Sequence, residues 1–240
     1  VRVASLASVV VIVGEGNGNN EVRIGDTRAA GVITGSGKND LTIGNGAQDA
    51  FGSTSMPGMA GSVAFVGWGY TFVNGGTAIY LNGAPGNAND NEIRMKSAAG
   101  SRSFVEVIGT GNNLIVGGAG DDGVSIAGDG NNTVRLAEGN DYVAITGGGD
   151  NWVNAGTGAN TVVISGNGDN RVTSSGTGSF TVTGTGVNRV CVGLDPNNSV
   201  YLNGAAAGSR VVGSASAFIA VNGWQIGGPG LFDGVTVSTI

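Results

Sequence analysis

One short motif repeats along the chain at a regular spacing, and this period is the strongest constraint on the fold. Each repeat has a glycine, an asparagine or aspartate two residues later, and a β-branched residue two residues after that. Between residues 109 and 192 the β-branched positions are Ile115, Val124, Val134, Val143, Val153, Val162 and Val172. Their sequence numbers rise in steps that alternate between 9 and 10, so that two steps add up to 19. A short fixed period is typical of an architecture in which successive units stack on one another.

Each unit is expected to contain one short strand with a single apolar face. Val134 and Leu136 are two residues apart, as are Val143 and Ile145, so each pair points to one side of a strand. Glycine and asparagine between the strands suit tight turns. Because a single unit cannot bury its apolar face, the units must stack. The sequence therefore predicts an all-β fold, a single parallel β-solenoid (β-roll or β-helix) with two short strands per coil and roughly a dozen coils.

The 19-residue period also predicts which polar side chains stack. One corner of each coil is expected to carry a structural ladder of Asn113, Asn132, Asn151 and Asn170. Their amides can hydrogen-bond along the stack and satisfy buried groups. The opposite corner carries Asp122, Asp141 and Asn160. Two carboxylates one coil apart, at a spacing of roughly 4.8 Å, repel each other unless water or a cation lies between them.

The segment Gly117-Gly118-Ala119-Gly120-Asp121-Asp122 resembles the glycine-aspartate nonapeptide of haemolysin-type (RTX) calcium-binding repeats. The paired units also resemble the extracellular β-solenoid repeats of large bacterial adhesins, some of which bind ice. The resemblance implies a right-handed parallel β-roll, secretion, and calcium held at the corners by aspartate and backbone carbonyls. Asparagine occupies most of the metal-binding positions here, so the calcium site that it implies is restricted to Asp121, Asp122 and Asp141. The alternative is a solvated acidic corner with no cofactor.

The whole chain, 1–240, is expected to form one solenoid domain. Within it, residues 1–17 are interpreted as an N-terminal cap or first coil and 44–90 as an irregular aromatic insertion. Residues 109–192 hold the most regular repeats, and 204–240 form closing coils. The motif is interrupted at Phe180, which is expected to replace an asparagine at a corner.

Two features outside the ladders are candidates for binding partners. Trp68, Tyr70 and Phe72 alternate, so they would share one face of a strand and could form a partner-binding or sugar-stacking platform. The alternative is that they fill a wider part of the core. Cys191 lies between two inward valines and is expected to point outward, where it could pair with another chain or be an ordinary surface residue.

Composition excludes several functional classes. Charged residues make up 12% of the chain and its net charge is −6, without a basic patch, so no nucleic-acid partner is expected. The chain has no histidine, which excludes Ser-His and Cys-His catalysis and histidine metal sites. One cysteine cannot form an internal disulfide. The apolar run Val3–Val13 is shorter than the roughly 20 residues of a membrane span, so no span is expected.

These observations favour a non-catalytic, secreted structural or adhesive protein of bacterial type. It would be a subunit of a cell surface, a filament or a virion surface, with cell-surface or polysaccharide contacts. Self-association end to end through the solenoid ends is expected, because the apolar segments 9–13 and 235–240 could pair with the next molecule. The alternatives are a calcium-dependent ligand-binding or ice-binding solenoid and a polysaccharide-acting β-helix enzyme.

Overall fold

The computed structural model describes residues 110–239 without a break. Before them it describes residues 2–3, 20–24, 31–35, 39–43, 62–67, 70–74, 78–82, 91–96, 99–100 and 102–108. None of these residues is helical, and no helix among them could therefore cross a membrane.

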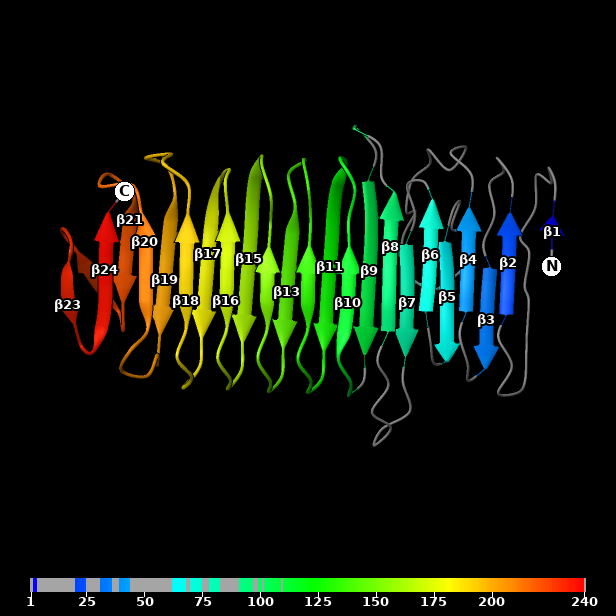
Figure 1. Ribbon diagram of the computed structural model, residues 1–240, viewed down its shortest axis with the longest axis horizontal. Helices are drawn as coiled ribbons and strands as arrows, with labels where there is room; N and C mark the ends of the chain where they lie inside the picture. The colour runs from blue at the N-terminus through cyan, green and yellow to red at the C-terminus, as the bar shows by residue number, and fades with distance from the viewer. Residues whose placement is uncertain are drawn as a thin grey trace.

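Two long sheets face each other along an elongated molecule, with their strands perpendicular to its long axis (Figure 1). The first sheet has ten strands, in the order β23 (Gly230–Phe232), β24 (Val235–Thr239), β20 (Arg210–Gly213), β18 (Arg189–Val192), β16 (Arg171–Ser174), β14 (Trp152–Asn154), β12 (Thr133–Arg135), β10 (Asn113–Val116), β8 (Asn91–Lys96) and β6 (Tyr70–Asn74). The second sheet has eleven, in the order β22 (Trp224–Ile226), β21 (Phe218–Val221), β19 (Ser199–Asn203), β17 (Thr177–Thr183), β15 (Ala159–Ser165), β13 (Tyr142–Thr146), β11 (Asp121–Ala127), β9 (Arg102–Ile108), β7 (Ala78–Asn82), β5 (Ser62–Gly67) and β3 (Gly31–Gly35). A third sheet joins β1 (Arg2–Val3), β2 (Asn20–Ile24) and β4 (Asn39–Ile43).

The chain alternates between the first and second sheets, and each coil contributes one strand to each. Ile115 pairs with Val134 in the first sheet, and Val124 pairs with Val143 in the second. Both pairings are parallel, and each joins residues one full repeat period apart. This confirms the predicted parallel β-solenoid with two strands per coil. From β10 to β21 the chain makes about six coils. The expected total of about a dozen also counts residues outside the described ranges.

The core is a pair of aliphatic files between the two sheets. Val134, Val153 and Val172 of the first sheet, and Val143 and Val162 of the second, are fully buried. Residues between them on each strand face outward, as in the burial pattern of β13. Because burying one such side chain stabilises the fold by roughly 1.5–3 kcal/mol, a regular file along many coils supplies most of the driving force.

The turns are tight because neighbouring coils almost touch there. Gly130 has a φ of +146°, and a Cβ on it would lie 2.0 Å from the carbonyl oxygen of Gly111, one coil away. Gly156 has a φ of +68°, and a Cβ there would lie 1.8 Å from the oxygen of Ala137. No other residue fits either position, and this explains why glycine recurs in the motif.

One coil is shorter than the others, and it corrects the expectation for Phe180. Val162 pairs with Phe180 and Asn160 pairs with Gly178, so the sequence numbers in each pair differ by 18 instead of 19. Phe180 is fully buried and pairs on its other side with Val200, so it belongs to the core file. The corner is taken by Gly178 instead. The missing residue lies in the turn, and strand pairing restores the register after it.

The C-terminal end is closed differently from the expected coil stacking. β24 pairs in parallel with β20 on one side and antiparallel with β23 on the other. β22 pairs antiparallel with β21 at the end of the second sheet. The segment 235–239 therefore has both edges occupied and cannot pair with another molecule. The edge strands at this end are β22 and β23, because each returns along its neighbour as a hairpin.

Several predicted features fall partly outside the described residues. In the region 44–90, β5 pairs with β3 and β7, and β6 pairs with β8, all parallel. In the region 1–17, β1 pairs in parallel with β2. The apolar segment 9–13 lies outside the described residues.

Candidate functional site

The predicted asparagine ladder is present and continuous. The side-chain Nδ2 of each member except the last donates a hydrogen bond to the Oδ1 of the equivalent residue in the next coil. These distances are 2.7, 2.8, 2.9 and 3.0 Å along the series Asn113, Asn132, Asn151, Asn170 and Asn188. All five side chains are buried. The ladder therefore contains the four predicted residues and a fifth, Asn188, which follows the shorter coil.

The inner ladder amides, those of Asn132, Asn151 and Asn170, use their full hydrogen-bonding capacity. The Oδ1 of Asn132 accepts from the backbone N–H of Asn113 at 3.2 Å as well as from its Nδ2. The Nδ2 of Asn132 donates to the carbonyl oxygen of Gly130 at 2.9 Å and to the Oδ1 of Asn151. The ladder satisfies polar groups of the turn that water cannot reach, since Asn132 is only 1% exposed.

The ladder ends at a serine. The backbone N–H of Asn188 donates to the Oγ of Ser209 at 2.9 Å, and that hydroxyl donates in turn to the carbonyl oxygen of Ala206 at 2.7 Å. Ser209 is fully buried. The series ends here because a hydroxyl has a single donor, which is already used by Ala206, and therefore cannot donate to a further coil.

The opposite corner, which we call the acidic corner, contains Asp122, Asp141 and Asn160. The backbone N–H of Asp122 donates to Asp141 Oδ1 at 2.8 Å, and the N–H of Asp141 donates to Asn160 Oδ1 at 3.0 Å. Asp122 Oδ2 accepts from the N–H of Gly118 at 3.0 Å. Both carboxylates are buried, at 1% and 2% exposure. Asp141 Oδ2 has no hydrogen-bond partner and is shielded from solvent.

Burial makes Asp141 a weak acid. Desolvation raises its pKa to about 7, the N–H of Asp122 lowers it, and the nearby carboxylates of Asp122 and Asp121 raise it further. Protonation lowers the cost of burying the unpartnered oxygen, because the desolvation free energy of a neutral carboxyl group is smaller than that of a carboxylate. Asp141 therefore holds a proton in the folded protein over much of the acidic pH range.

Asp121, the third predicted metal ligand, lies apart from the acidic corner. It precedes Asp122 in β11, so the two side chains leave opposite faces of the strand. Asp121 Oδ1 accepts from the backbone N–H of Asn140 at 2.8 Å, and Oδ2 lies 3.8 Å from Nε of Arg102. The structure brings Asp122 and Asp141 together but leaves Asp121 on the outer surface.

No cluster of three or more His, Cys, Asp or Glu side chains is placed to hold a metal ion in the part of the chain that the structure describes. Calcium binding, which the haemolysin-type resemblance implies, stays a prediction. It can be tested by titrating calcium and following the melting temperature, since a ligand that binds only the folded state raises it.

A second ladder, which the sequence pattern also contains, runs along the outer surface of one turn. We call it the outer ladder. A side-chain oxygen of each member accepts from a backbone N–H of the next coil, at 2.7–2.8 Å, along the series Asn112, Asn131, Asp150 and Asp169. These residues precede the asparagine ladder by one position and recur with the same period, so the period could have revealed them. Because their contacts are exposed, water can replace them.

The predicted aromatic platform is described only in part. Tyr70 and Phe72 lie in β6, where their backbones pair with Glu92 and Arg94 of β8. Trp68 lies outside the described residues. The platform stays a prediction.

A column of arginines crosses the outer face of the first sheet, and the strict 19-residue period does not predict it. Arg171 pairs with Arg189, and Arg189 with Arg210, so that three exposed arginines occupy equivalent positions on β16, β18 and β20. We call this set the arginine column. Their sequence numbers differ by 18 and then by 21, and only the strand register aligns them. Trp152 occupies the equivalent position on β14.

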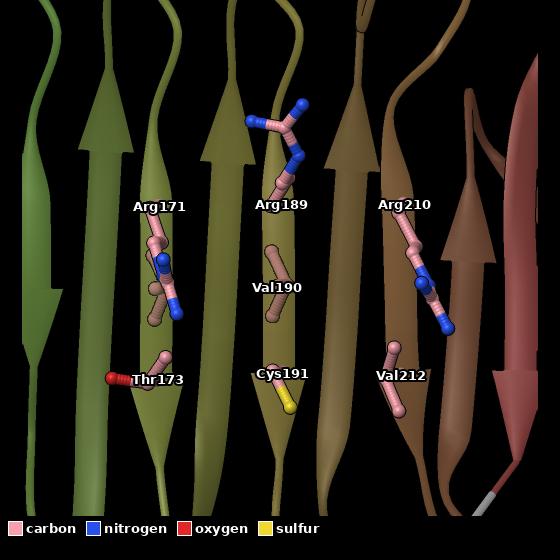
Figure 2. A pocket seen from close by; sticks show the side chains of 8 residues that line it. Arg171, Thr173, Arg189, Val190, Cys191, Arg210 and Val212 are labelled. Carbon is pink, nitrogen blue, oxygen red and sulfur yellow. The ribbon is translucent and has the colours of Figure 1, made fainter.

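The arginine column borders a shallow depression with a volume of about 190 Å³. It is also lined by the half-buried Thr173 and Val212 and by the exposed Cys191, which follow the arginines by two residues on the same strands (Figure 2). Cys191 is a free, exposed thiol flanked by the buried Val190 and Val192, as the alternation predicts.

Comparison of the chain with known protein families, with curated proteins and with solved structures finds no match among any of them.

Proposed function

We propose that this protein is a non-catalytic structural or adhesive solenoid that acts outside the cell, as a subunit of a cell surface, a filament or a virion surface. The observation that carries the proposal is the continuous asparagine ladder. Together with backbone pairing in both sheets, it connects each coil to the next through buried hydrogen bonds. A molecule built in this way resists bending and presents repeated columns of side chains along its length.

The shape of the molecule supports this role. The first strand, β1, and the last, β24, lie toward opposite ends of the long axis (Figure 1), so the molecule can separate two attachment points. On the outer face of the second sheet, Thr161, Ser179 and Ser199 form a row of small polar residues in register, and the row continues to the exposed aromatic residues Tyr142 and Phe218. Such faces suit contact with an extended partner rather than enclosure of a small substrate.

Self-association is proposed to use the strands at the C-terminal end. Trp224 of β22 and Leu231 of β23 are 76% and 71% exposed, and both lie on edge strands. Exposed apolar residues on unpaired strand edges favour pairing with another chain. The partner would be the N-terminal end of the next molecule, which gives an open-ended filament because the contact is head to tail.

Sedimentation and electron microscopy over a range of protein concentrations test the assembly. We expect single rods at low concentration and longer linear species at high concentration. Replacement of Trp224 and Leu231 by serine should abolish the longer species. The matched control replaces Tyr142 and Leu194, which are 47% and 66% exposed elsewhere on the molecule. Single rods of the unmodified protein at every concentration would reject end-to-end assembly.

A further inference from the structure

Charge is strongly segregated over the continuously described part of the chain. Residues 110–239 contain four basic side chains, all arginine: Arg135, Arg171, Arg189 and Arg210. All four lie on outer positions of the first sheet. The same segment contains nine aspartates and glutamates, none of them in a strand of that sheet. In a chain of net charge −6, the strands of one face therefore carry only positive charge over this segment.

The arginine column has no internal counter-charge. The single salt bridge between described side chains is that of Arg102 with Asp121, on the second sheet. Neighbouring strands lie roughly 4.8 Å apart, so the three arginines repeat along about 10 Å of the rod. Like charges directly opposite each other on adjacent strands destabilise a sheet. Figure 2 shows one way in which the repulsion is reduced, since the guanidinium of Arg189 turns along its strand away from those of Arg171 and Arg210.

The end of the column is held in place by an aromatic ring. The guanidinium carbon of Arg135 lies 4.6 Å from the ring centre of Trp152, and that of Arg171 lies 6.0 Å from it. Both distances are in the range of cation–π attraction. The ring thus orders the guanidinium groups of Arg171, at one end of the column, and of the neighbouring Arg135. It leaves Arg189 and Arg210 open to solvent.

We propose that the arginine column binds a linear acidic polysaccharide whose carboxylate or sulfate groups follow the long axis of the rod. The inference deepens the adhesive role proposed above and rests on it. Guanidinium groups bind carboxylate and sulfate oxygens through paired, charge-assisted hydrogen bonds. A polymer with a regularly repeated anion can meet one arginine per coil. Thr173 lines the adjoining depression, and its hydroxyl donates to the carbonyl oxygen of Val153 at 3.4 Å, which leaves its oxygen able to accept from a sugar hydroxyl.

The surroundings favour a polysaccharide over a nucleic acid. Proteins that bind single strands without sequence preference stack successive bases on several aromatic side chains. Here a single aromatic residue, Trp152, lies in register beside the column, and Arg135 lies over its ring. A short row of cations beside a shallow depression therefore fits a chain that is bound by its charges and hydroxyl groups.

Cys191 provides a reporter inside the proposed site. It is the chain's single cysteine, it is exposed, and it lines the same depression as the three arginines. Polygalacturonate at saturation should slow its modification by an uncharged thiol reagent about tenfold, because the bound polymer covers the depression. Neutral dextran should leave the rate unchanged. An unchanged rate with both polygalacturonate and dextran sulfate, each tested at high concentration, overturns the proposal without any substitution in the protein.

Binding of labelled polygalacturonate or dextran sulfate, each compared with neutral dextran, tests the chemistry. Arg189→Gln should weaken binding of the preferred acidic polymer about fivefold and lower the slope of log affinity against log salt by about one. Arg102→Gln removes the same charge from the opposite sheet and should change affinity less than about twofold. Replacement of all three column arginines by glutamine should abolish binding while the melting temperature shows that the rod is folded.

The results distinguish a carboxylate ligand from a sulfate ligand, and they test polysaccharide binding separately from end-to-end assembly. Preference for either acidic polymer supports the inference and identifies the anion as carboxylate or sulfate. Full binding by the triple variant, or tighter binding of an oligothymidylate than of either acidic polysaccharide, overturns it. The assay uses a concentration at which the protein sediments as a single species. If the molecules do not assemble end to end, the binding test can still be carried out. If no acidic polysaccharide binds, the sedimentation test of assembly is unaffected.

Discussion

Neighbouring asparagines in the same turn have opposite roles, and substitution should distinguish them. Asn132 is buried and makes hydrogen bonds to both adjacent coils, whereas Asn131 is exposed and accepts one backbone hydrogen bond at 2.7 Å. Asn132→Ala leaves several buried groups unpaired and should lower the free energy of unfolding by about 2–4 kcal/mol. Asn131→Ala should cost less than about 1 kcal/mol, because water can replace its contact. Denaturant unfolding measures both, and equal losses would contradict the buried ladder.

The acidic corner should make stability depend on pH in an unusual direction. Asp141 has a folded-state pKa of about 7 against an ordinary value of 3.8. Between these values the folded state holds a proton that the unfolded state releases, so stability falls as pH rises. Asp141→Asn removes this titration and keeps an oxygen for the N–H of Asp122. The variant should match the unmodified protein near pH 4 and exceed it by about 2–4 kcal/mol near pH 8.

A matched control for this pH effect is Asp150→Asn. It removes one carboxylate from the exposed outer ladder and keeps the oxygen that accepts from the N–H of Asp169. Urea unfolding at several pH values should give a difference from the unmodified protein that hardly varies with pH. If the stability gain of Asp141→Asn were also the same at every pH, Asp141 would be ionised in the folded protein and its assignment as a buried acid would be wrong.

At the scale of a strand, strict alternation decides which substitutions are tolerated. In β13, Val143 is fully buried between the sheets, and its neighbour Tyr142 is 47% exposed. Val143→Asp places a carboxylate without a partner in a narrow core and should unfold the central coils. Tyr142→Asp adds the same charge one residue away and should cost less than about 1 kcal/mol. Circular dichroism and thermal melting measure both effects, and tolerance of both charges would contradict the register.

The same alternation explains how much could be predicted from the sequence. The parallel solenoid, the four ladder asparagines and the acidic corner follow from the constant 19-residue period, and the outward direction of Cys191 follows from alternation along its strand. The arginine column could not be predicted from this period, because the sequence numbers of its arginines differ by 18 and then by 21. Turns absorb such changes in length, whereas strand pairing keeps the register. Phe180 was misplaced for the same reason, since it follows a turn that is one residue shorter.

At the scale of the whole molecule, strand pairing in the coils differs from strand pairing at the C-terminal end. Inside the rod each strand has a parallel neighbour on both sides, and the sequence period reports that relation directly. At the C-terminal end the pairing becomes antiparallel in β22 and β23, and nothing repeats from which a period could be read. A closing element is set by the need to occupy an edge rather than by stacking. For this reason the prediction that segment 235–240 pairs with the next molecule is wrong for β24, which lies inside the sheet with a neighbour on each side.

If the rod is a linear sum of coils, removal of one complete coil should leave a folded, shorter rod. Deletion of residues 133–151 removes one full period and places Trp152 directly after Asn132, so Asn132 can donate to Asn170 in place of Asn151. The variant should melt cooperatively, and small-angle scattering should show a rod shorter by about 5 Å. Deletion of 133–142 removes only part of a coil and would turn Val143 and Ile145 outward, so it should not fold. Survival of both variants, or loss of both, would contradict a rod built from interchangeable coils.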